Sequence, residues 1–263
     1  MISFKDYQSA KGINASFLKA CLQGAYQGYK YLHESKKPSA EMAFGSALHH
    51  YILEPDTFID HYLVQPKVDR RTKVGKEQAE AFERLANGKE IIDEEDLAKI
   101  ARIHSRLHDN AIFKDLYANT YKEASYFAEF VDGHQYKARF DMVNPSSGII
   151  VDLKTTRSAD RVSFTRDIFN LGYDLQMLHY ANVLGCNHPL RLPSCLIVAI
   201  EKDSEQIAYY DLSEIAYSDY TQKRYEKALK TAHQVLTLNH CPNKYDETIT
   251  RLTMPIWLEG SDQ

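Results

Sequence analysis

The chain lacks the features that mark secreted, disulfide-bonded and membrane proteins. Its four cysteines, Cys21, Cys186, Cys195 and Cys241, are scattered and form no CxxC pair, so they predict neither a disulfide framework nor a zinc or iron–sulfur site. No apolar run approaches the roughly 18 residues of a membrane span, and the N-terminus has no signal-peptide apolar core. These absences favour a cytoplasmic protein without a membrane partner.

The chain also lacks an excess of positive charge, repeats and low-complexity segments. Its formal net charge of −4 over 263 residues argues against a generally basic surface for nucleic acid, although it is compatible with a local basic groove. Hydrophobic residues make up 44% of the chain, which is enough for a substantial core in an ordinary globular protein.

Residues 136–156 predict a β-hairpin. Apolar and polar residues alternate from Tyr136 onward, turn-forming residues occupy 144–148, and a β-branched run follows at 149–151. A turn centred between residues 146 and 147 would place Val143 opposite Ile150.

The same register brings two acids of the hairpin together. Asp141 would lie opposite Asp152, with Cβ atoms roughly 4.5–5.5 Å apart, while Arg139 and Lys154 would share the faces of these acids. Two close carboxylates repel each other unless a cation compensates, and Mg²⁺ typically uses one or two carboxylates together with substrate phosphate oxygens. The alternative interpretation is a solvated hairpin edge with ordinary charges.

Helical and extended segments surround this hairpin. Periodicity predicts helices over 17–35, 42–55, 89–113, 163–184 (with a break at Gly172) and 213–239, and strands over 123–131, 196–200, 206–210 and, as a strand or extended arm, 251–260. This order predicts an α/β fold with a central mixed β-sheet flanked by helices. We expect one domain, with a helical part over about 1–115, a sheet core over about 120–210 and a C-terminal helix and tail over about 213–263.

Side chains from two of the predicted helices are candidates for a site over the sheet. His49 and His50 flank an apolar stripe on opposite sides, and periodicity does not choose between them; a packing role is the alternative for either. Gln176 and Tyr180 are spaced i, i+4 and share one helix face. His179, in the same helix, is expected to pack in the core.

Residues 64–78 are rich in lysine and arginine and poor in apolar residues, which predicts an exposed, mobile basic loop. Arg70 and Arg71 lie at its centre. Such a run is usually a solvated surface, and the functional alternative is an arm that contacts DNA phosphates.

Six motifs in order resemble the PD-(D/E)xK nuclease superfamily, with its restriction-endonuclease-like core, and within it the RecE-type exonucleases of the exodeoxyribonuclease VIII group of bacteria and prophages. In this chain they are GSALH at 45–49, EAS at 123–125, KARFD at 137–141, DLKTT at 152–156, YDLQ at 173–176 with Tyr180, and MPIW at 254–257. Two departures are Phe140 in place of the proline in the superfamily name and Asp152 where many relatives have glutamate.

The resemblance implies roles for these residues. It selects His49 over His50 and implies that His49, Asp141, Asp152 and the Leu153 carbonyl surround a Mg²⁺ ion, for which Mn²⁺ can substitute. Lys154 would orient or deprotonate the attacking water or neutralise charge in the transition state. Arg139, Gln176 and Tyr180 would contact phosphate or nucleotide. Glu123 would bind a second metal or have a structural role at the end of its strand.

The resemblance also implies an activity. Such an enzyme degrades linear double-stranded DNA from its ends, 5′ to 3′, and leaves 3′ single strands for recombination and repair. It implies a homo-oligomer, with a ring as one form, and a single-strand annealing protein as partner.

Two other functions compete with this one. Another PD-(D/E)xK nuclease is the first, but the iron–sulfur members of helicase and CRISPR systems need clustered cysteines that this chain does not have. A catalytically silent DNA-binding module is the second. The presence of Asp141, Asp152 and Lys154 together argues against it, because a silent relative has no chemical reason to keep all three.

Overall fold

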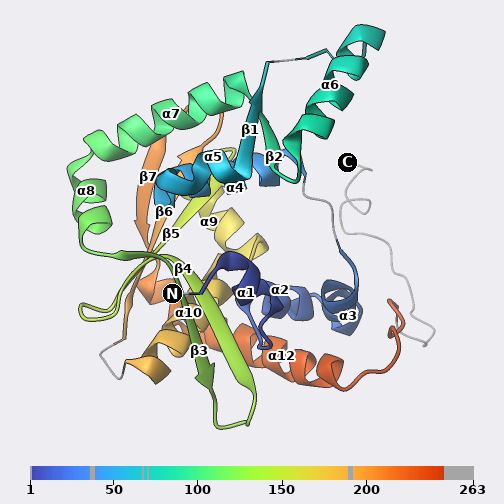
Figure 1. The fold of residues 1–263 in the computed structure, drawn as a ribbon. Coiled ribbons are helices and arrows are strands. Elements are labelled where there is room, and N and C mark those ends of the chain that lie inside the picture. Colours follow the sequence, from blue (N-terminus) through green and yellow to red (C-terminus); the bar gives the residue numbers. More distant parts are fainter. Residues whose placement is uncertain (1, 36–38, 67, 70, 189–191, 246–263) are drawn as a thin grey trace, which may run out of the picture.

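The computed structural model describes residues 2–35, 39–66, 68–69, 71–188 and 192–245. These residues form an α/β fold around a five-stranded mixed sheet with helices on both faces, which confirms the predicted fold class (Figure 1). The strands of this sheet are β3 (Tyr121–Glu129), β4 (Gln135–Asn144), β5 (Ile149–Thr156), β6 (Ser194–Glu201) and β7 (Ile207–Asp211).

The strand order in the sheet follows the order of the sequence, from β3 to β7. β3, β4 and β5 form the predicted antiparallel meander, whereas β5 and β6 are parallel neighbours. Parallel neighbours need a crossover connection. Helices α9 (Arg161–Asn170) and α10 (Tyr173–Asn187) supply it and thereby bring α10 against the face of β5.

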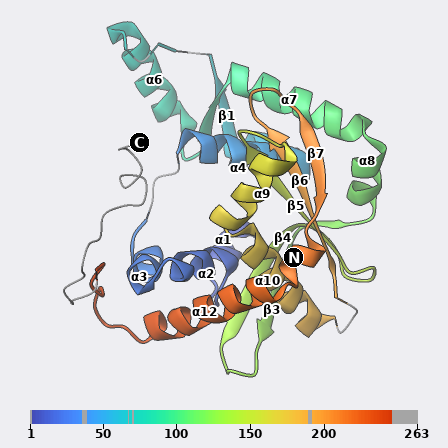
Figure 2. The same cartoon turned by 180° about the vertical axis from the view of Figure 1, so that it is seen from behind.

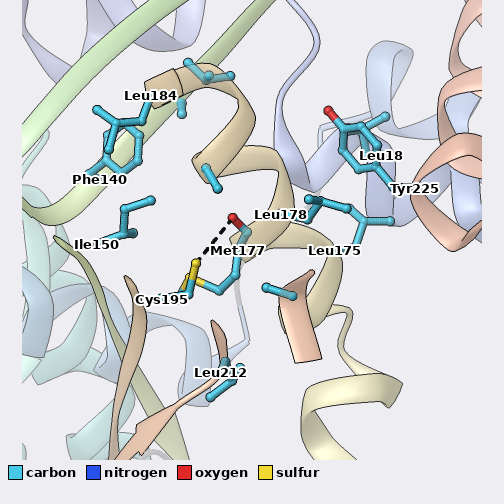
Figure 3. Close-up of a cluster of buried hydrophobic side chains, with 14 of the residues drawn as sticks. Leu18, Phe140, Ile150, Leu175, Met177, Leu178, Leu184, Cys195, Leu212 and Tyr225 are labelled. Carbon is cyan, nitrogen blue, oxygen red and sulfur yellow. Dashed lines mark hydrogen bonds between the residues drawn. The ribbon is translucent and has the colours of Figure 1, made fainter. Parts of the chain in front are cut away.

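Two hydrophobic clusters cover the two faces of the sheet. Side chains alternate along β5, so Ile150 joins one cluster and Val151 the other. The Ile150 cluster contains buried residues from one face of the meander and from α10, some of which Figure 3 shows around Met177 and Leu178. Its other helices are α9, α2 (Ala15–Leu22), α11 (Ser213–Ala216) and α12 (Asp219–Leu236), with α3 (Ala25–His33) packed against α2 and α12.

The Val151 cluster lies on the opposite face, so the sheet is the middle layer of the fold (Figures 1 and 2). Its helices are α4 (Ala40–Leu53), α5 (Phe58–His61), which follows a 3-10 turn at Pro55–Thr57, α7 (Glu94–Asp109) and α8 (Ala111–Ala118). The short helix α1 (Phe4–Ser9) is held to the sheet by Lys137 of β4, whose Nζ donates to the carbonyls of Tyr7 and Ala10 at 2.9 and 2.5 Å.

The predicted break at Gly172 is confirmed. Gly172 has φ of 68°, a left-handed conformation that suits glycine, and it separates α9 from α10. The predicted single helix over 213–239 is instead two helices, because the hydroxyl of Ser218 accepts a hydrogen bond from the amide of Thr221 and so begins α12 afresh.

The prediction of a loop over 64–78 is wrong. β1 (Tyr62–Gln65) ends at residue 65 and α6 (Lys73–Ala86) begins at residue 73, where the Thr72 hydroxyl accepts a hydrogen bond of 3.0 Å from the Gly75 amide. The predicted helix over 89–113 also begins too early, because β-branched Ile91 and Ile92 lie in β2 (Glu90–Asp93), which pairs in parallel with β1. Arg70, the predicted arm at 251–260 and the motif at 254–257 lie outside the described residues.

Within the ranges that the structure describes, no helix combines the length and apolar character needed to cross a membrane.

Candidate active site

The two strands of the hairpin separate at the positions of Asp141 and Asp152. The predicted register is confirmed up to this point, since Val143 pairs with Ile150 and Met142 with Val151. Beyond Met142 and Val151, β4 is paired with β3 and β5 with β6, so the pairs between β4 and β5 end one step before Asp141 and Asp152. The two acids therefore stand at a split in the sheet.

Asp141 fills this split with its side chain. Its Oδ2 accepts a hydrogen bond of 2.7 Å from the main-chain amide of Leu153 and lies 3.5 Å from Nδ1 of His49 on α4. Burial alone would raise the pKa of Asp141, but the charges of His49 and Lys154 and the Leu153 amide outweigh it and lower that pKa. Asp141 is therefore held as a carboxylate.

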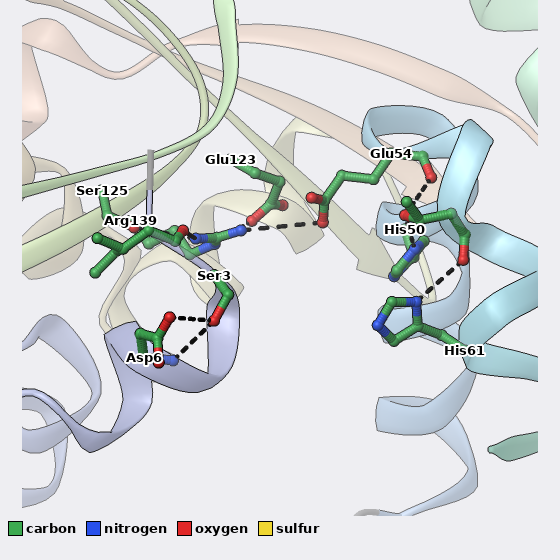
Figure 4. Close-up of polar contacts among 10 residues, drawn as sticks. Ser3, Asp6, His50, Glu54, His61, Glu123, Ser125 and Arg139 are labelled. Carbon is green, nitrogen blue, oxygen red and sulfur yellow. Dashed lines mark hydrogen bonds and ion pairs between the residues drawn. The ribbon is translucent and has the colours of Figure 1, made fainter. Parts of the chain in front are cut away.

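The structure brings His49, and not His50, to the acids. Burial alone would lower the pKa of His49, but the charge of Asp141 outweighs it and raises that pKa, so the two side chains form an ion pair. His50 has other partners: its Nε2 lies 2.9 Å from the Thr57 hydroxyl and its ring 4.6 Å from that of His61 (Figure 4).

Asp152 lies deeper than Asp141, with 1% of its side chain exposed. Its Oδ1 accepts a hydrogen bond of 2.7 Å from Nε2 of Gln176, and its Oδ2 is ion-paired with Lys154. Burial raises the pKa of Asp152, and the charge of Asp141 adds to this against the opposing effect of Lys154. The two acids thus have pKa values that are shifted in opposite directions.

Lys154 is enclosed by groups that favour its charged form. Burial would lower its pKa, but Asp152 and Asp141 outweigh burial and raise it. Its Nζ also lies 5.0 Å from the ring centroid of Tyr173, a distance at which a cation–π interaction contributes. Lys154 is therefore held as an ammonium ion.

Helix α10 presents Tyr173, Gln176 and Tyr180 along one face, as the i, i+4 spacing of the last two predicts. The ring of Tyr180 packs on that of Phe140 with centroids 4.9 Å apart, and burial with the nearby acids raises the pKa of its hydroxyl well above the usual value. Tyr180 is therefore a neutral hydrogen-bonding group in this site.

His179 faces the core, as expected for a packing residue. It is fully buried, with Nε2 at 3.0 Å from the Lys137 carbonyl and Nδ1 at 3.1 Å from the Tyr225 hydroxyl. Burial lowers its pKa to about 4.

Glu123 and Arg139 are paired with each other across β3 and β4. Arg139 Nε donates to Oε2 of Glu123 at 2.5 Å and Nη1 donates to the Ser125 hydroxyl at 3.0 Å, while Nη2 lies 3.9 Å from Oε2 of Glu54 (Figure 4). Only 9% of the Arg139 side chain is exposed. To make the predicted phosphate contact, Arg139 would have to break its contacts with Glu123 and Glu54 or bind the phosphate in addition to them.

Glu123 has an unusual backbone conformation for a residue in a strand. Its φ is 49°, and the pairs between β3 and β4 skip it, although Lys122 and Ala124 on either side are paired. Burial and the charge of Asp141 raise its pKa to about 7, despite the nearby Arg139. This local departure from the sheet occurs beside Asp141, across from the point where β5 separates.

One further member of the site, Lys19 of α2, was not expected from any sequence pattern. Its Nζ donates a hydrogen bond of 2.5 Å to Oε1 of Gln176 and lies 5.0 Å from the ring centroid of Tyr173. Burial and the charge of Lys154 lower the pKa of Lys19 to about 7. No spacing rule could have linked two residues that lie 157 positions apart.

A cavity of about 2490 Å³ opens over these residues. Its wall includes basic side chains from separate parts of the chain, namely Lys89, Lys122, Arg157 and Lys202, and the site residues His49, Glu123, Arg139, Asp141, Gln176 and Tyr180. Arg71 projects into solvent with 91% of its side chain exposed, where its guanidinium binds Asp69 through Nε and Nη2 at 2.9 and 3.0 Å.

The donor set suits a hard divalent cation. Among the described residues, no three His, Cys, Asp or Glu side chains gather closely enough to form a ready-made metal cluster. Mg²⁺ needs no such cluster, because it commonly uses one or two carboxylates and keeps several waters. Oδ2 of Asp152 is buried and accepts no hydrogen bond of good geometry, although it is ion-paired with Lys154. A cation beside Asp141 and Asp152 would compensate the buried negative charge of the Asp152 carboxylate.

The model of a PDDEXK-like domain family of unknown function, DUF3799, matches residues 14–249. The chain belongs to this family. The superfamily expected from the six motifs is thereby confirmed, and nucleases with the PDDEXK motif generally use divalent metals.

Other comparisons are more distant. No curated protein matches the chain. A crystal structure of a phage-related exonuclease from Haemophilus somnus 129PT is similar at 13% identity and a TM-score of 0.36, over 89% of this chain and 98% of that one. The crystal structure of SSO0001 is similar at 14% identity and a TM-score of 0.33, over 88% and 90%.

Proposed function

We propose that this chain is a metal-dependent nuclease that hydrolyses phosphodiester bonds in DNA. The observation that carries the proposal is the arrangement of Asp141, Asp152 and Lys154: a carboxylate at a split in the sheet, a second, more deeply buried acid beside it, and a charged lysine paired with that acid. Burying such charged groups costs stability, and groups perturbed in this way cluster at sites of binding or chemistry.

Asp141, Asp152 and the Leu153 carbonyl would hold Mg²⁺, or Mn²⁺ in its place, with His49 beside Asp141 and Glu123 as a candidate for a second ion. Bound there, the ion would polarise the phosphoryl oxygen, lower the pKa of a water and stabilise the leaving oxyanion. Because Gln176 and Lys154 both hold Asp152, that carboxylate needs little reorganisation to act as a ligand.

Lys154 is the candidate for handling charge during hydrolysis. Its raised pKa keeps the amine protonated, which favours orientation of the attacking water and stabilisation of transition-state charge over removal of a proton. Tyr180 and Gln176 border the cavity and are candidates for contacts with phosphate or nucleotide.

The order of the motifs supports a narrower proposal. By their resemblance to RecE-type exonucleases, the substrate is the end of linear double-stranded DNA, digested 5′ to 3′ to leave a 3′ single strand for recombination and repair. The basic side chains on the cavity wall, Lys89, Lys122, Arg157 and Lys202, suit a phosphate backbone. A homo-oligomeric ring around the duplex and a single-strand annealing partner belong to the same proposal, with residues 1–263 as one nuclease domain.

An end-labelled duplex assay tests the proposal. Linear DNA labelled at either the 5′ or the 3′ end is incubated with the protein and Mg²⁺, with Mg²⁺ and excess chelator, or with Mn²⁺, and closed circular DNA serves as the control. We expect Mg²⁺-dependent release of nucleotides from linear DNA, early loss of the 5′ label and intact circles. Linear DNA that survives excess protein and Mg²⁺ would refute the proposal, and binding without hydrolysis would indicate a silent DNA-binding module.

A further inference from the structure

A hydrogen-bonded chain runs from the N-terminal helices to the second acid of the site. Lys19 Nζ donates to Oε1 of Gln176 at 2.5 Å, and Gln176 Nε2 donates to Oδ1 of Asp152 at 2.7 Å. The three residues come from α2, α10 and β5, which are far apart in the sequence. The position of the Asp152 carboxylate therefore depends on how α2 packs against α10.

The stem of Lys19 has a defined path to this position. It passes over the N-terminus of α10, where a Cβ atom on Gly172 would lie only 3.1 Å from Cγ of Lys19. Tyr173 holds the ammonium group by its ring face, 5.0 Å from the centroid. The lysine is thus seated against the first turn of α10 rather than free in the cavity.

These two hydrogen bonds permit only one orientation of the Gln176 amide. The carboxylate of Asp152 accepts hydrogen bonds, so the amide nitrogen of Gln176 faces it and the amide oxygen is left to accept from Lys19, which in its protonated form has only donors. A reversed amide would place its oxygen beside the carboxylate and its nitrogen beside the ammonium group. Both contacts would be repulsive. Without Lys19, the repulsion between the ammonium group and the nitrogen of a reversed amide would disappear.

We propose that Lys19 is a positioning residue of the candidate active site, which fixes the amide of Gln176 and through it the carboxylate of Asp152. The proposal rests on the function proposed above, because it assigns Lys19 to the same metal-dependent site. Lys19 would act on the placement of a ligand and not on the DNA itself. Its loss would therefore lower kcat and metal affinity while leaving KM for DNA nearly unchanged.

Four variants separate this role from a general effect on folding. Lys19→Met keeps the apolar stem and removes the donors, whereas Lys19→Arg keeps donors. Gln176→Leu removes the amide that Lys19 holds. Lys30→Met is the matched control, because it removes one lysine from the neighbouring helix α3, where Lys30 forms an ion pair with Glu34 at 2.9 Å on the surface.

Two readouts are needed, one of them independent of hydrolysis. In the duplex assay, we expect Lys19→Met to lower kcat about 10- to 100-fold, since small misplacements of catalytic groups have effects of that size. Lys19→Arg should remain within about threefold of the original protein. By calorimetric titration with Mn²⁺ in the absence of DNA, Lys19→Met and Gln176→Leu should both weaken binding by about tenfold or more, as losses of residues that orient metal ligands do. Lys30→Met should behave as the original protein in both readouts.

The combination of Lys19→Met with Gln176→Leu decides whether Lys19 acts through Gln176. If it does, the second substitution should add almost nothing to the first, whereas independent effects would multiply. A full additional loss in the double variant would overturn the proposal. Unchanged Mn²⁺ affinity in Gln176→Leu would overturn it even if Lys19→Met failed to fold.

The titration also separates this inference from the proposed function. An original protein that binds Mn²⁺ but hydrolyses no DNA would refute the nuclease proposal while the Mn²⁺ arms still tested Lys19. An active original protein with unchanged kcat in Lys19→Met would refute the role of Lys19 alone.

Discussion

The main-chain amide of Leu153 donates a hydrogen bond of 2.7 Å to Oδ2 of Asp141. The Asp141 side chain on β4 thus accepts a hydrogen bond from β5 beyond the point at which the pairing of these two strands ends. The same carboxylate is the first candidate ligand for the metal. Asp141 therefore has a structural and a chemical task, and substitutions can separate them.

We expect Asp141→Asn to fold but to lose hydrolysis by at least about 100-fold, because the amide oxygen can still accept from Leu153 but the ligand charge is gone. Asp141→Ala removes the acceptor as well and leaves a buried amide unpaired, which typically costs about 1–3 kcal/mol. Urea denaturation with chelator present should show the alanine variant to be the less stable of the two by about that amount. Retained hydrolysis in Asp141→Asn would remove Asp141 from the set of metal ligands.

Lys154→Ala should abolish hydrolysis while DNA binding persists. The lysine is ion-paired with Asp152 and its pKa is raised, so its charge is available in the site at neutral pH. Loss of such a preorganised charge commonly costs about 100- to 1000-fold in kcat. Single-turnover hydrolysis and fluorescence anisotropy with labelled duplex would measure the two effects separately, with Lys30→Met as the control. Unaltered turnover would exclude the lysine from the mechanism.

The parts of the fold that local patterns encode could be predicted from the sequence. The alternation along β4, the turn at 144–148 and the β-branched start of β5 together specify the pairing of Val143 with Ile150. The break at Gly172 has an equally local cause, a backbone conformation that suits glycine.

Contacts between distant segments could not be predicted in this way. Strands β1 and β2 are four residues long, and the parallel pairing between them depends on the crossover helix α6. Lys19 reaches Gln176 only because α2 packs on α10. Arg139 shares the predicted face of Asp141, but Glu123 and Ser125 on β3 bind its guanidinium, and no rule for β4 alone contains that pairing.

Arg70 and Arg71, which precede α6 in the sequence, provide a test of DNA binding away from the acids. We predict that Arg70→Gln combined with Arg71→Gln weakens duplex binding and flattens its salt dependence, by about 0.9 in the log–log slope for each phosphate that the variant no longer neutralises. Arg71 is nearly fully exposed, and its guanidinium would have to exchange Asp69 for a phosphate.

Arg102→Gln is the matched control, because Arg102 is likewise bound through two nitrogens to one carboxylate, that of Glu205 on the surface. Anisotropy at several salt concentrations gives both slopes. An unchanged slope in the double variant would mean that these arginines are solvated surface charges.

His179 makes the stability of the fold depend on pH in a defined direction. Its folded-state pKa of about 4 lies below the ordinary value of 6.5, because the ring is buried between the Lys137 carbonyl and the Tyr225 hydroxyl. Between these two values the unfolded chain binds a proton that the folded chain does not bind. The contribution of His179 to stability is therefore complete above pH 6.5 and is lost as the pH falls towards 4.

The variant His179→Gln keeps a donor and an acceptor but cannot titrate. The free energy of unfolding of the original protein should fall relative to that of the variant by up to about 1.4 kcal/mol per pH unit between pH 6.5 and 4. Urea denaturation at four or five pH values, with chelator present, measures this difference, and His33→Gln on the outer surface of α3 is the control for a histidine in solvent. Curves for the original protein and His179→Gln that stay parallel across this window would show that His179 is protonated inside the fold, and its ring would then need a partner for the added charge.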